Sequence, residues 1–286
     1  MPGPGLKEAI AAHVRDGQTL ALEGFTHLIP FAAAHEILRQ GRRELHLVRM
    51  TPDLVYDQMI GAGCARALTF SWGGNPGVGS LHRLRDAVEN GWPRPLAITE
   101  HSHAGMAAAY TAGASNLPFG VLRGYAGTDL VRVNDQVRSV TCPYTGETLA
   151  TVPALRPDVT ILHAQRADRR GNVLLSGIVG AQKEAAFAAR ALLVTVEEVV
   201  DDLDAPMNAV VLPRQVVTAV ACVPGGAWPS YAQGHYPRDN AFYRGWDRVS
   251  RDRDSFDRWM GKHVLGTCDH AGFLRSVRAE AIPAGA

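Results

Sequence analysis

Short apolar runs alternate along this chain with longer segments in which apolar residues recur at helical spacing. The short runs are 19–22, 45–48, 67–71, 119–122, 159–162 and 192–196. The longer segments are 6–14, 32–39, 54–61, 81–89 and 105–114. This alternation is typical of βαβ units, and strands that are apolar throughout favour a parallel sheet covered on both faces. We therefore predict an α/β fold with an open, mostly parallel sheet and flanking helices.

Two segments depart from this alternation. Residues 130–151 carry Asp, Asn and Thr-Gly turn signals, and we expect them to form a small, irregular inserted lobe. After residue 224 the pattern loosens into aromatic and charged residues. The sequence thus predicts one α/β domain over residues 1–224 and a C-terminal extension, 225–286, that packs on the domain or on a partner subunit. The aromatic side chains of the extension favour an interface with a partner.

Composition and charge exclude several classes of function. Lys and Arg number 29 against 28 Asp and Glu, a net charge of +1, so no basic field is available to attract nucleic acid or a membrane surface. No run approaches the roughly 20 apolar residues of a membrane helix. The first residues lack a basic segment followed by an apolar one, and we expect a cytoplasmic protein. The four scattered cysteines predict neither a metal site nor a disulfide framework.

Three loops share one layout, in which a strand is followed by a glycine-bearing turn and then by a helix. They are 23–30, 73–77 and 100–105. In open α/β sheets such turns lie at the carboxyl ends of the strands, where ligands bind. None carries the dinucleotide fingerprint or the phosphate loop of nucleotide-binding proteins, so nicotinamide and ATP chemistry are not indicated.

The third of these loops holds several side chains that handle protons. Ser102 is predicted to cap the helix that follows, and His101 and His103 lie beside its N-terminus. The helix dipole and the free N–H groups of the first turn favour negative charge that develops there. The alternative is that both histidines are solvated loop residues.

The loops resemble those of the A subunit of family I coenzyme A transferases, and especially those of the glutaconate CoA-transferase branch. The matching segments are Ala21–Phe25 with Ile29 and Pro30, Ser71–Val78, Glu100–Phe119, His163–Asp168, Gly171–Val173, Val196–Glu198, Val211–Pro213, Gly226–Ser230 and Gly234–Tyr236. The resemblance spans roughly residues 5 to 265. It implies the open α/β fold that these transferases share with certain sugar-phosphate isomerases.

The resemblance also implies that this chain is one of the two different subunits that together form the active enzyme. In this family an A subunit pairs with a homologous B subunit, as a heterodimer or an A2B2 heterotetramer, and the B subunit supplies the glutamate that attacks the acyl-CoA. The substrates are an acyl-CoA and a carboxylic acid, so coenzyme A is a substrate and no cofactor is permanently bound. A carboxylate becomes a useful nucleophile when it is desolvated and held against the thioester carbonyl.

Alignment of this loop with that of family members indicates His103 as a catalytic candidate. Family members place Gln or another polar residue fourteen positions before the segment that corresponds to Leu117, and this count arrives at His103. An imidazole N–H can donate a hydrogen bond to the thioester oxygen. Glu100 lies three residues upstream, and a relative that hydrolyses and opens rings of steroid-derived CoA thioesters has a carboxylate in this loop. A CoA-thioester hydrolase with Glu100 and His103 in the site is therefore the alternative.

Further residues are predicted to bind substrate. They are Glu23, Gly24 and Phe25 in the first loop, Gly74, Asn75 and Gly77 in the second, Ser102 in the third, and Arg123 after the run 119–122. Each also has a structural alternative, as a cap, a turn or a scaffold residue. Two other functions stay open: a non-catalytic acyl-CoA-binding subunit, and a sugar-phosphate isomerase, although the isomerase needs a phosphate loop that the sequence lacks.

Overall fold

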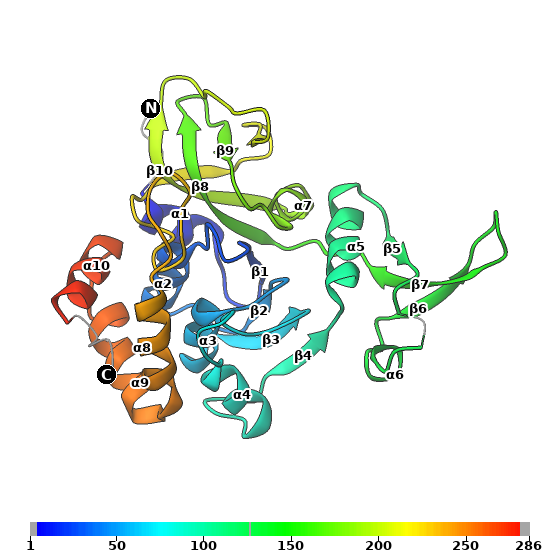
Figure 1. The fold of residues 1–286 in the computed structure, drawn as a ribbon, viewed down its shortest axis with the longest axis horizontal. Coiled ribbons are helices and arrows are strands. Elements are labelled where there is room, and N and C mark those ends of the chain that lie inside the picture. The colour runs from blue at the N-terminus through cyan, green and yellow to red at the C-terminus, as the bar shows by residue number, and fades with distance from the viewer. Residues whose placement is uncertain (1–4, 126, 281–286) are drawn as a thin grey trace.

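The computed structural model describes residues 5–125 and 127–280 of the chain and contains two sheets (Figure 1). The larger sheet lies at the centre, and seven of its strands run parallel in the order β4, β3, β2, β1, β8, β10, β12. Two short antiparallel strands, β9 and β11, continue from β8. These findings confirm the predicted open, mostly parallel sheet.

Five of the predicted apolar runs correspond to strands of the central sheet, namely β1, β2, β3, β8 and β10, whereas the run 119–122 forms β5 of the smaller sheet. The bounds of the strands in the central sheet are β1 Thr19–Leu22, β2 Leu45–Val48, β3 Ala65–Phe70, β4 Ala97–Glu100, β8 Val159–Asp168, β9 Val173–Leu175, β10 Ala191–Val200, β11 Val210–Leu212 and β12 Ala219–Cys222. The helices that connect them are α1 Leu6–His13, α2 Phe31–Arg39, α3 Leu54–Gly61, α4 His82–Glu89, α5 His103–Ala114 and α7 Gln182–Ala188.

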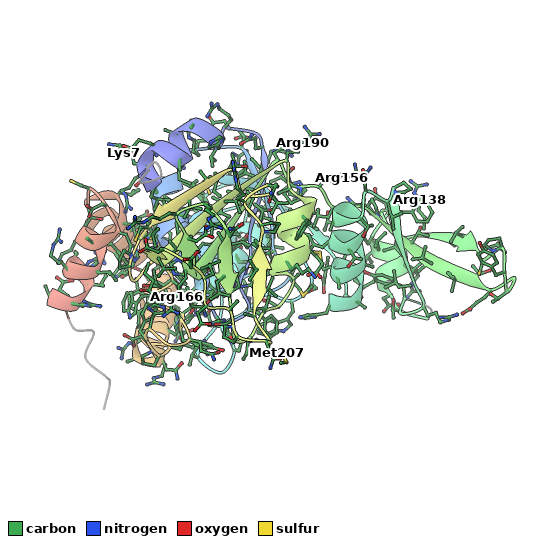
Figure 2. All side chains as sticks on the ribbon, turned by 90° about the horizontal axis from the view of Figure 1, so that it is seen from above. Lys7, Arg138, Arg156, Arg166, Arg190 and Met207 are labelled. Carbon is green, nitrogen blue, oxygen red and sulfur yellow. The ribbon has the colours of Figure 1, made fainter. Side chains whose placement is uncertain are left out.

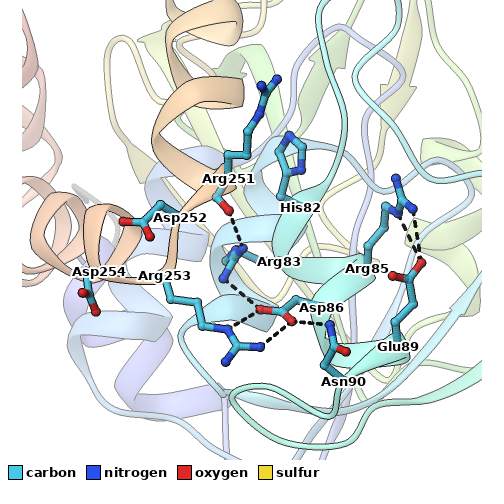
Figure 3. A pocket seen from close by; sticks show the side chains of 10 residues that line it. All are labelled: His82, Arg83, Arg85, Asp86, Glu89, Asn90, Arg251, Asp252, Arg253 and Asp254. Carbon is cyan, nitrogen blue, oxygen red and sulfur yellow. Dashed lines mark hydrogen bonds and ion pairs between the residues drawn. The ribbon is translucent and has the colours of Figure 1, made fainter.

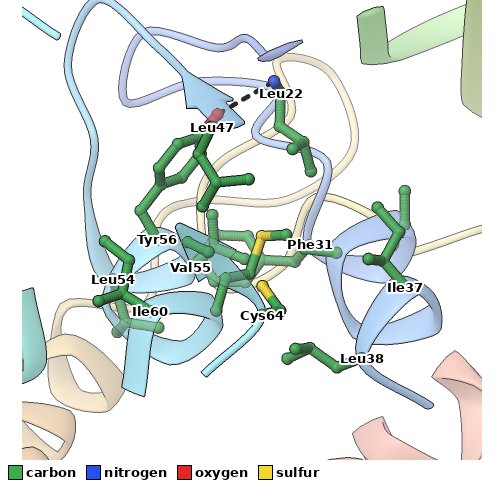
Figure 4. Packing of buried hydrophobic residues seen from close by; sticks show 14 of the residues in the cluster. Leu22, Phe31, Ile37, Leu38, Leu47, Leu54, Val55, Tyr56, Ile60 and Cys64 are labelled. Carbon is green, nitrogen blue, oxygen red and sulfur yellow. Dashed lines mark hydrogen bonds between the residues drawn. The ribbon is translucent and has the colours of Figure 1, made fainter. Parts of the chain in front are cut away.

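Helices cover both faces of the sheet because successive strand residues point to opposite faces. Leu20 and Leu22 of β1 pack with α1 to α4 in the main core (Figure 4), whereas Ala21 between them packs against α5 and α7. A hydrogen bond of 3.1 Å between Leu22 N and the Tyr56 hydroxyl crosses the main core. Small residues on the second face allow α5 and α7 to approach the sheet closely.

The inserted lobe is more regular than its turn signals predicted. Strand β5 (Phe119–Leu122) pairs antiparallel with β7 (Thr148–Pro153), and β7 pairs with β6 (Arg138–Thr141); a short helix, α6 (Leu130–Val133), precedes β6. The lobe projects from the body of the molecule beyond α5, with Arg138 on it (Figure 2). Ala150 and Val152, which alternate along β7 and so share one face, pack with Ala108 and Ala109 of α5.

The C-terminal extension is helical and packs on its own chain. It contains α8 (Asn240–Arg251), α9 (Arg253–Trp259), the π-helical turn η1 (Met260–Leu265) and α10 (His270–Ala279). Trp246, Phe256 and Phe273 are almost fully buried and belong to the main core. Of the aromatics expected to face a partner subunit, namely Trp228, Tyr231, Tyr236, Phe242 and Trp246, the expectation is wrong for Phe242 and Trp246, because packing within the chain already buries them.

No helix in the described part of the chain is long and apolar enough to cross a membrane.

Candidate active site

A polar cleft of about 550 Å³ lies between α4 and the start of α9 (Figure 3). Asp86 holds it together by accepting hydrogen bonds from Arg253 at 2.7 Å and from Arg83 at 3.0 Å. The hydrogen bonds from Arg253 lower the pKa of Asp86 to about 2. This cleft lies away from the carboxyl ends of the strands, and its charges neutralise one another, so we assign it a structural role.

A second cavity, of about 310 Å³, lies at the carboxyl ends of the first four strands. Each of the loops that follow β1, β2, β3 and β4 contributes to it, as expected where parallel strands end at one edge of a sheet. The C-terminal extension closes the remaining side. The lining residues are Phe25, Thr26, Arg49, Thr51, Asp53, Trp72, Gly74, Pro76, His103, Arg238 and Tyr243.

The loop after β1 is held in a tight conformation. A Cβ atom at Gly24 would meet the carbonyl oxygens of His27 and Leu28 at 2.9 Å, so only glycine fits there. Thr26 and Leu28 have φ angles of 57° and 54°, in the left-handed region that side chains other than glycine rarely adopt. Such backbone strain persists only where the surroundings fix it.

The C-terminal extension provides the contacts that fix this loop. Leu28 N donates to Tyr231 O at 3.0 Å, and Ile29 N donates to Ser230 Oγ at 3.1 Å. The His27 ring accepts from Gln233 N through Nε2 at 3.0 Å, so Nδ1 carries the proton that is donated to Ile178 O. Burial lowers the pKa of His27, which keeps the ring neutral in this arrangement.

Arg49, directly after β2, is fully buried at the base of the cavity. Its Nη1 donates to Asp53 Oδ1 at 2.9 Å, and its Nη2 donates to Gly24 O at 2.8 Å. The pair joins the loop after β1 to the N-terminus of α3, where Asp53 is also the cap. The carboxylate of Asp53 is thus already occupied by its ion pair with Arg49 and by the cap of α3.

Arg238 and Tyr243 form the wall that the extension contributes. The Arg238 guanidinium lies 4.2 Å from the centre of the Tyr243 ring, and its Nη1 donates to Pro76 O at 3.2 Å. The loop before Arg238 is anchored at Glu197 of β10, which accepts hydrogen bonds from His163, Tyr236 and Gly225 N. Although burial opposes ionisation of Glu197, these bonds lower its pKa, and a charged carboxylate here holds the loop firmly.

His103 is the first residue of α5 and lies at the cavity with its side chain exposed. Ser102 caps the helix, accepting from Gly105 N at 3.0 Å, which confirms the predicted cap. His101 points elsewhere: it is buried and its Nδ1 lies 3.1 Å from the Tyr125 hydroxyl. A Cβ atom at Gly105 would meet that same hydroxyl at 1.9 Å, so the turn requires glycine.

Glu23 does not line the cavity. It is 2% exposed, and its Oε1 accepts hydrogen bonds from Tyr110 at 2.8 Å and from Met50 N at 2.9 Å. Burial raises the pKa of the carboxyl, against the opposing effects of Arg49 and of these hydrogen bonds. Its contacts join the ends of β1 and β2 to α5, so Glu23 is a buried scaffold residue and not the capping or solvated loop residue expected as the alternative.

Three of the predicted site residues line the cavity and the others lie around or away from it. Phe25, Gly74 and His103 line it. Asn75 and Gly77 line a neighbouring hollow of about 280 Å³, and the Asn75 Oδ1 accepts from Leu54 N at the start of α3. Gly24 contributes its carbonyl oxygen to Arg49.

Glu100 and Arg123 lie outside the cavity. Glu100 is the last residue of β4, is exposed, and does not line the cavity that His103 lines. Arg123 lies on the projecting lobe and pairs with Glu147 at 2.8 Å. The predicted contact of Arg123 with a substrate carboxylate is therefore not supported, because strand pairing carries it away with the lobe.

Sequence reasoning missed Arg49, Asp53, Arg238 and Tyr243. Arg49 had a usable signal, since a charged residue directly after a mostly apolar strand lies at the edge of the sheet where ligands bind. Arg238 and Tyr243 had none, because only tertiary packing of the extension brings them to the cavity. No group of three or more His, Cys, Asp or Glu side chains suited to a metal occurs among the residues that the structure describes.

Comparisons with known proteins agree with this geometry. The sequence profile named "Coenzyme A transferase" matches residues 5–222. The A subunit of 3-oxoadipate CoA-transferase from Pseudomonas knackmussii is 65% identical over 95% of this chain and 96% of its own length. The A subunit of glutaconate CoA-transferase from Acidaminococcus fermentans is 32% identical over 96% and 91% of the two chains.

Solved structures show the same fold. The crystal structure of the Acidaminococcus fermentans glutaconate CoA-transferase superposes with a TM-score of 0.89 and covers 97% of this chain and 93% of its own, at 31% identity. A decarboxylase, AibA/AibB, superposes with a TM-score of 0.77 over 90% of this chain and 97% of its own, at 29% identity. The resemblance drawn from the glycine-bearing loops is thus confirmed. The chain belongs to the coenzyme A transferase family.

Proposed function

We propose that this chain is the A subunit of a two-subunit CoA-transferase that moves coenzyme A from an acyl-CoA to 3-oxoadipate or a closely similar 3-oxo dicarboxylic acid. The identity of 65% to the A subunit of a 3-oxoadipate CoA-transferase, along almost the whole of both chains, supports this substrate. Coenzyme A enters as a substrate, and no permanently bound cofactor is required.

The residues that line the cavity support the proposal that the attacking glutamate comes from the B subunit. Asp53 is the one carboxylate among the described residues that line the cavity, and it is paired with Arg49 at 2.9 Å. A carboxylate in a buried ion pair is a poor nucleophile because its charge is already stabilised. The cavity therefore offers hydrogen-bond donors and a binding wall but no free attacking group, which fits a nucleophilic glutamate supplied by a B subunit.

The reaction then proceeds by covalent catalysis. The partner's glutamate attacks the thioester carbonyl, the bond to sulfur breaks, and an acyl anhydride and CoA thiolate form. The thiolate attacks the glutamyl carbonyl of the anhydride, which releases the first carboxylic acid and leaves an enzyme thioester. The acceptor acid reverses these steps. In this scheme His103 donates a hydrogen bond to the thioester oxygen as negative charge develops on it.

The proposal is tested by producing the chain together with a B subunit of the family. The complex, an AB heterodimer or an A2B2 heterotetramer, should transfer CoA to 3-oxoadipate with ping-pong kinetics, and borohydride added after the acyl-CoA should inactivate it by reducing the enzyme thioester. The separate chain is the control and should transfer nothing.

Three outcomes would contradict the proposal. Transfer by the separate chain would remove the need for a partner's glutamate. Release of free CoA without an acceptor acid would favour a hydrolase, although Glu100 lies outside the cavity. Binding of acyl-CoA by the complex with neither transfer nor hydrolysis would favour a non-catalytic binding subunit.

A further inference from the structure

Side chains that line the cavity carry hydrogen-bond donors for which the chain provides no acceptor. The Nε atoms of Arg49 and Arg238 are buried without a partner, and the buried hydroxyl of Tyr243 finds no acceptor. Buried polar groups in native proteins are nearly always paired. Arg238 thus has hydrogen-bonding capacity that the chain does not use, and because its guanidinium lines the cavity, an acceptor group of a ligand would meet it there.

The charges in the cavity indicate what kind of acceptor that is. The charge of Arg49 is balanced by Asp53. Across the described part of the chain, no carboxylate lies within 4.0 Å of the Arg238 guanidinium, whose direct contacts are the Pro76 carbonyl and the Tyr243 ring. Among the lining residues, Arg49 and Arg238 share one carboxylate, Asp53, so the lining carries one positive charge in excess. The guanidinium of Arg238 is a planar group whose geometry matches a carboxylate.

Arg238 is also fixed in position before any ligand arrives. The hydrogen bond to Pro76 and the stacking on Tyr243 hold its guanidinium from two sides, and Asp239 caps α8 directly after it. A cation that is already oriented loses little freedom on binding an anion. Phe25, Trp72 and Pro76 give the same cavity apolar surface suited to a short methylene chain.

We propose that Arg238 binds the carboxylate at the end of the acyl group remote from the thioester, and so makes the enzyme selective for dicarboxylic over monocarboxylic substrates. This inference rests on the proposed function, since it concerns the same cavity. A monocarboxylic acyl group of equal length leaves the guanidinium unpaired, and a site built for a polar partner rejects an analogue that lacks it.

The test uses the complex with the B subunit and compares two acceptor acids, 3-oxoadipate and 3-oxohexanoate, which differ only in the distal carboxylate. We expect Arg238→Gln to raise KM for 3-oxoadipate by roughly 10- to 150-fold, the range for losing a hydrogen bond to a charged group, with kcat little changed. KM for 3-oxohexanoate should change little. Arg238→Lys should restore part of the loss, since it returns the charge without the planar fork.

Arg244→Gln is the matched control. Arg244 lies on α8 close to Arg238, is exposed and does not line the cavity, so this variant should keep the preference of the unaltered complex. Equal losses for both acceptors in Arg238→Gln would overturn the inference, as would a rise in KM for every CoA donor, which would assign Arg238 to the CoA phosphates. If the unaltered complex does not transfer CoA to 3-oxoadipate at all, the proposed function fails instead.

Discussion

Among the described residues of α5, His103 is the one whose side chain lines the cavity, and it is also the first residue of the helix. Its neighbours are fixed, since Ser102 caps the helix and Gly105 packs directly under Tyr125. The exposed ring is free to turn toward a substrate. A donor placed here acts at the site where the helix dipole already favours negative charge.

We expect His103→Ala to lower kcat by about 10²–10³, or roughly 3–4 kcal/mol, because a donor of this kind acts mainly in the transition state. His103→Gln should recover much of the loss, since an amide N–H donates at similar reach. Steady-state kinetics of the complex with the B subunit would measure both. His13→Ala, on α1 away from the cavity, serves as control.

A different ranking of these variants would assign a different role. If His103→Gln were as inactive as His103→Ala, the residue would be transferring a proton rather than donating a hydrogen bond. A fully active alanine variant would leave His103 as a solvated residue of the cavity rim.

At the level of elements, helix α4 is capped by a residue of another helix. Its own N-cap residue, Leu81, provides no side-chain acceptor. Asp57 of α3 takes this role: its Oδ1 accepts from Arg83 N at 2.8 Å and from Leu84 N at 2.9 Å, and its Oδ2 accepts from Trp246 Nε1 at 3.1 Å. A single carboxyl group therefore joins α3, α4 and α8.

Burial raises the pKa of Asp57 to about 7, and this makes the stability of the fold depend on pH. Since the folded state binds the proton more tightly than the unfolded state, the contribution of Asp57 is complete at about pH 4 and is lost as pH rises toward 7. The loss should reach at most about 4 kcal/mol, from 1.36 kcal/mol per pKa unit. Denaturant unfolding at a series of pH values measures it.

Asp57→Asn is the control, because it keeps one acceptor oxygen for α4 and does not titrate. The difference in unfolding free energy between the two proteins should therefore change between pH 4 and pH 7 and stay constant above. Parallel stability curves across this range would show that Asp57 does not titrate there.

Elements buried on both faces were predictable from the sequence, and elements placed by long-range packing were not. The strands Thr19–Leu22 and Leu45–Val48 have the bounds that their mostly apolar runs predicted, since a parallel strand covered on both faces is nearly all apolar. Helix α8 is strongly amphipathic, with Phe242, Tyr243 and Trp246 buried and arginines exposed, so its pattern was present in the sequence and the prediction of a loosened extension missed it. In the site, Phe25, Gly74 and His103 follow strands and were found, whereas Arg238 depends on contacts with distant segments.

At the level of the whole molecule, the C-terminal extension contributes buried residues to the main core and is not a surface addition. Trp246 is 1% exposed, stacks on Phe256 at 5.8 Å and on Trp259 at 5.1 Å between ring centres, and bonds to Asp57. Residues of α8, α9 and α10 belong to the same cluster as those of α1 to α4. The extension and the domain should therefore unfold together.

We expect Trp246→Ala to lower the free energy of unfolding by about 3–5 kcal/mol, the usual cost of removing a large buried aromatic side chain. The loss should appear in one cooperative denaturant transition followed by both fluorescence and circular dichroism. Tyr144→Ala, at a residue that is 94% exposed on the projecting lobe, should change stability by less than about 0.5 kcal/mol. Two separate transitions in the tryptophan variant would show that the extension unfolds independently.

The contacts between the C-terminal extension and the loop after β1 also mean that the cavity is completed late in synthesis. Phe25 and Thr26 leave the ribosome early, but Ser230, Tyr231 and Arg238, which hold or face that loop, are made much later. At about 5–20 residues per second, this interval is on the order of ten to forty seconds. During this interval the nascent chain has no finished cavity. If the cavity binds substrate as proposed, we expect a product of interrupted translation that lacks these residues to be inactive.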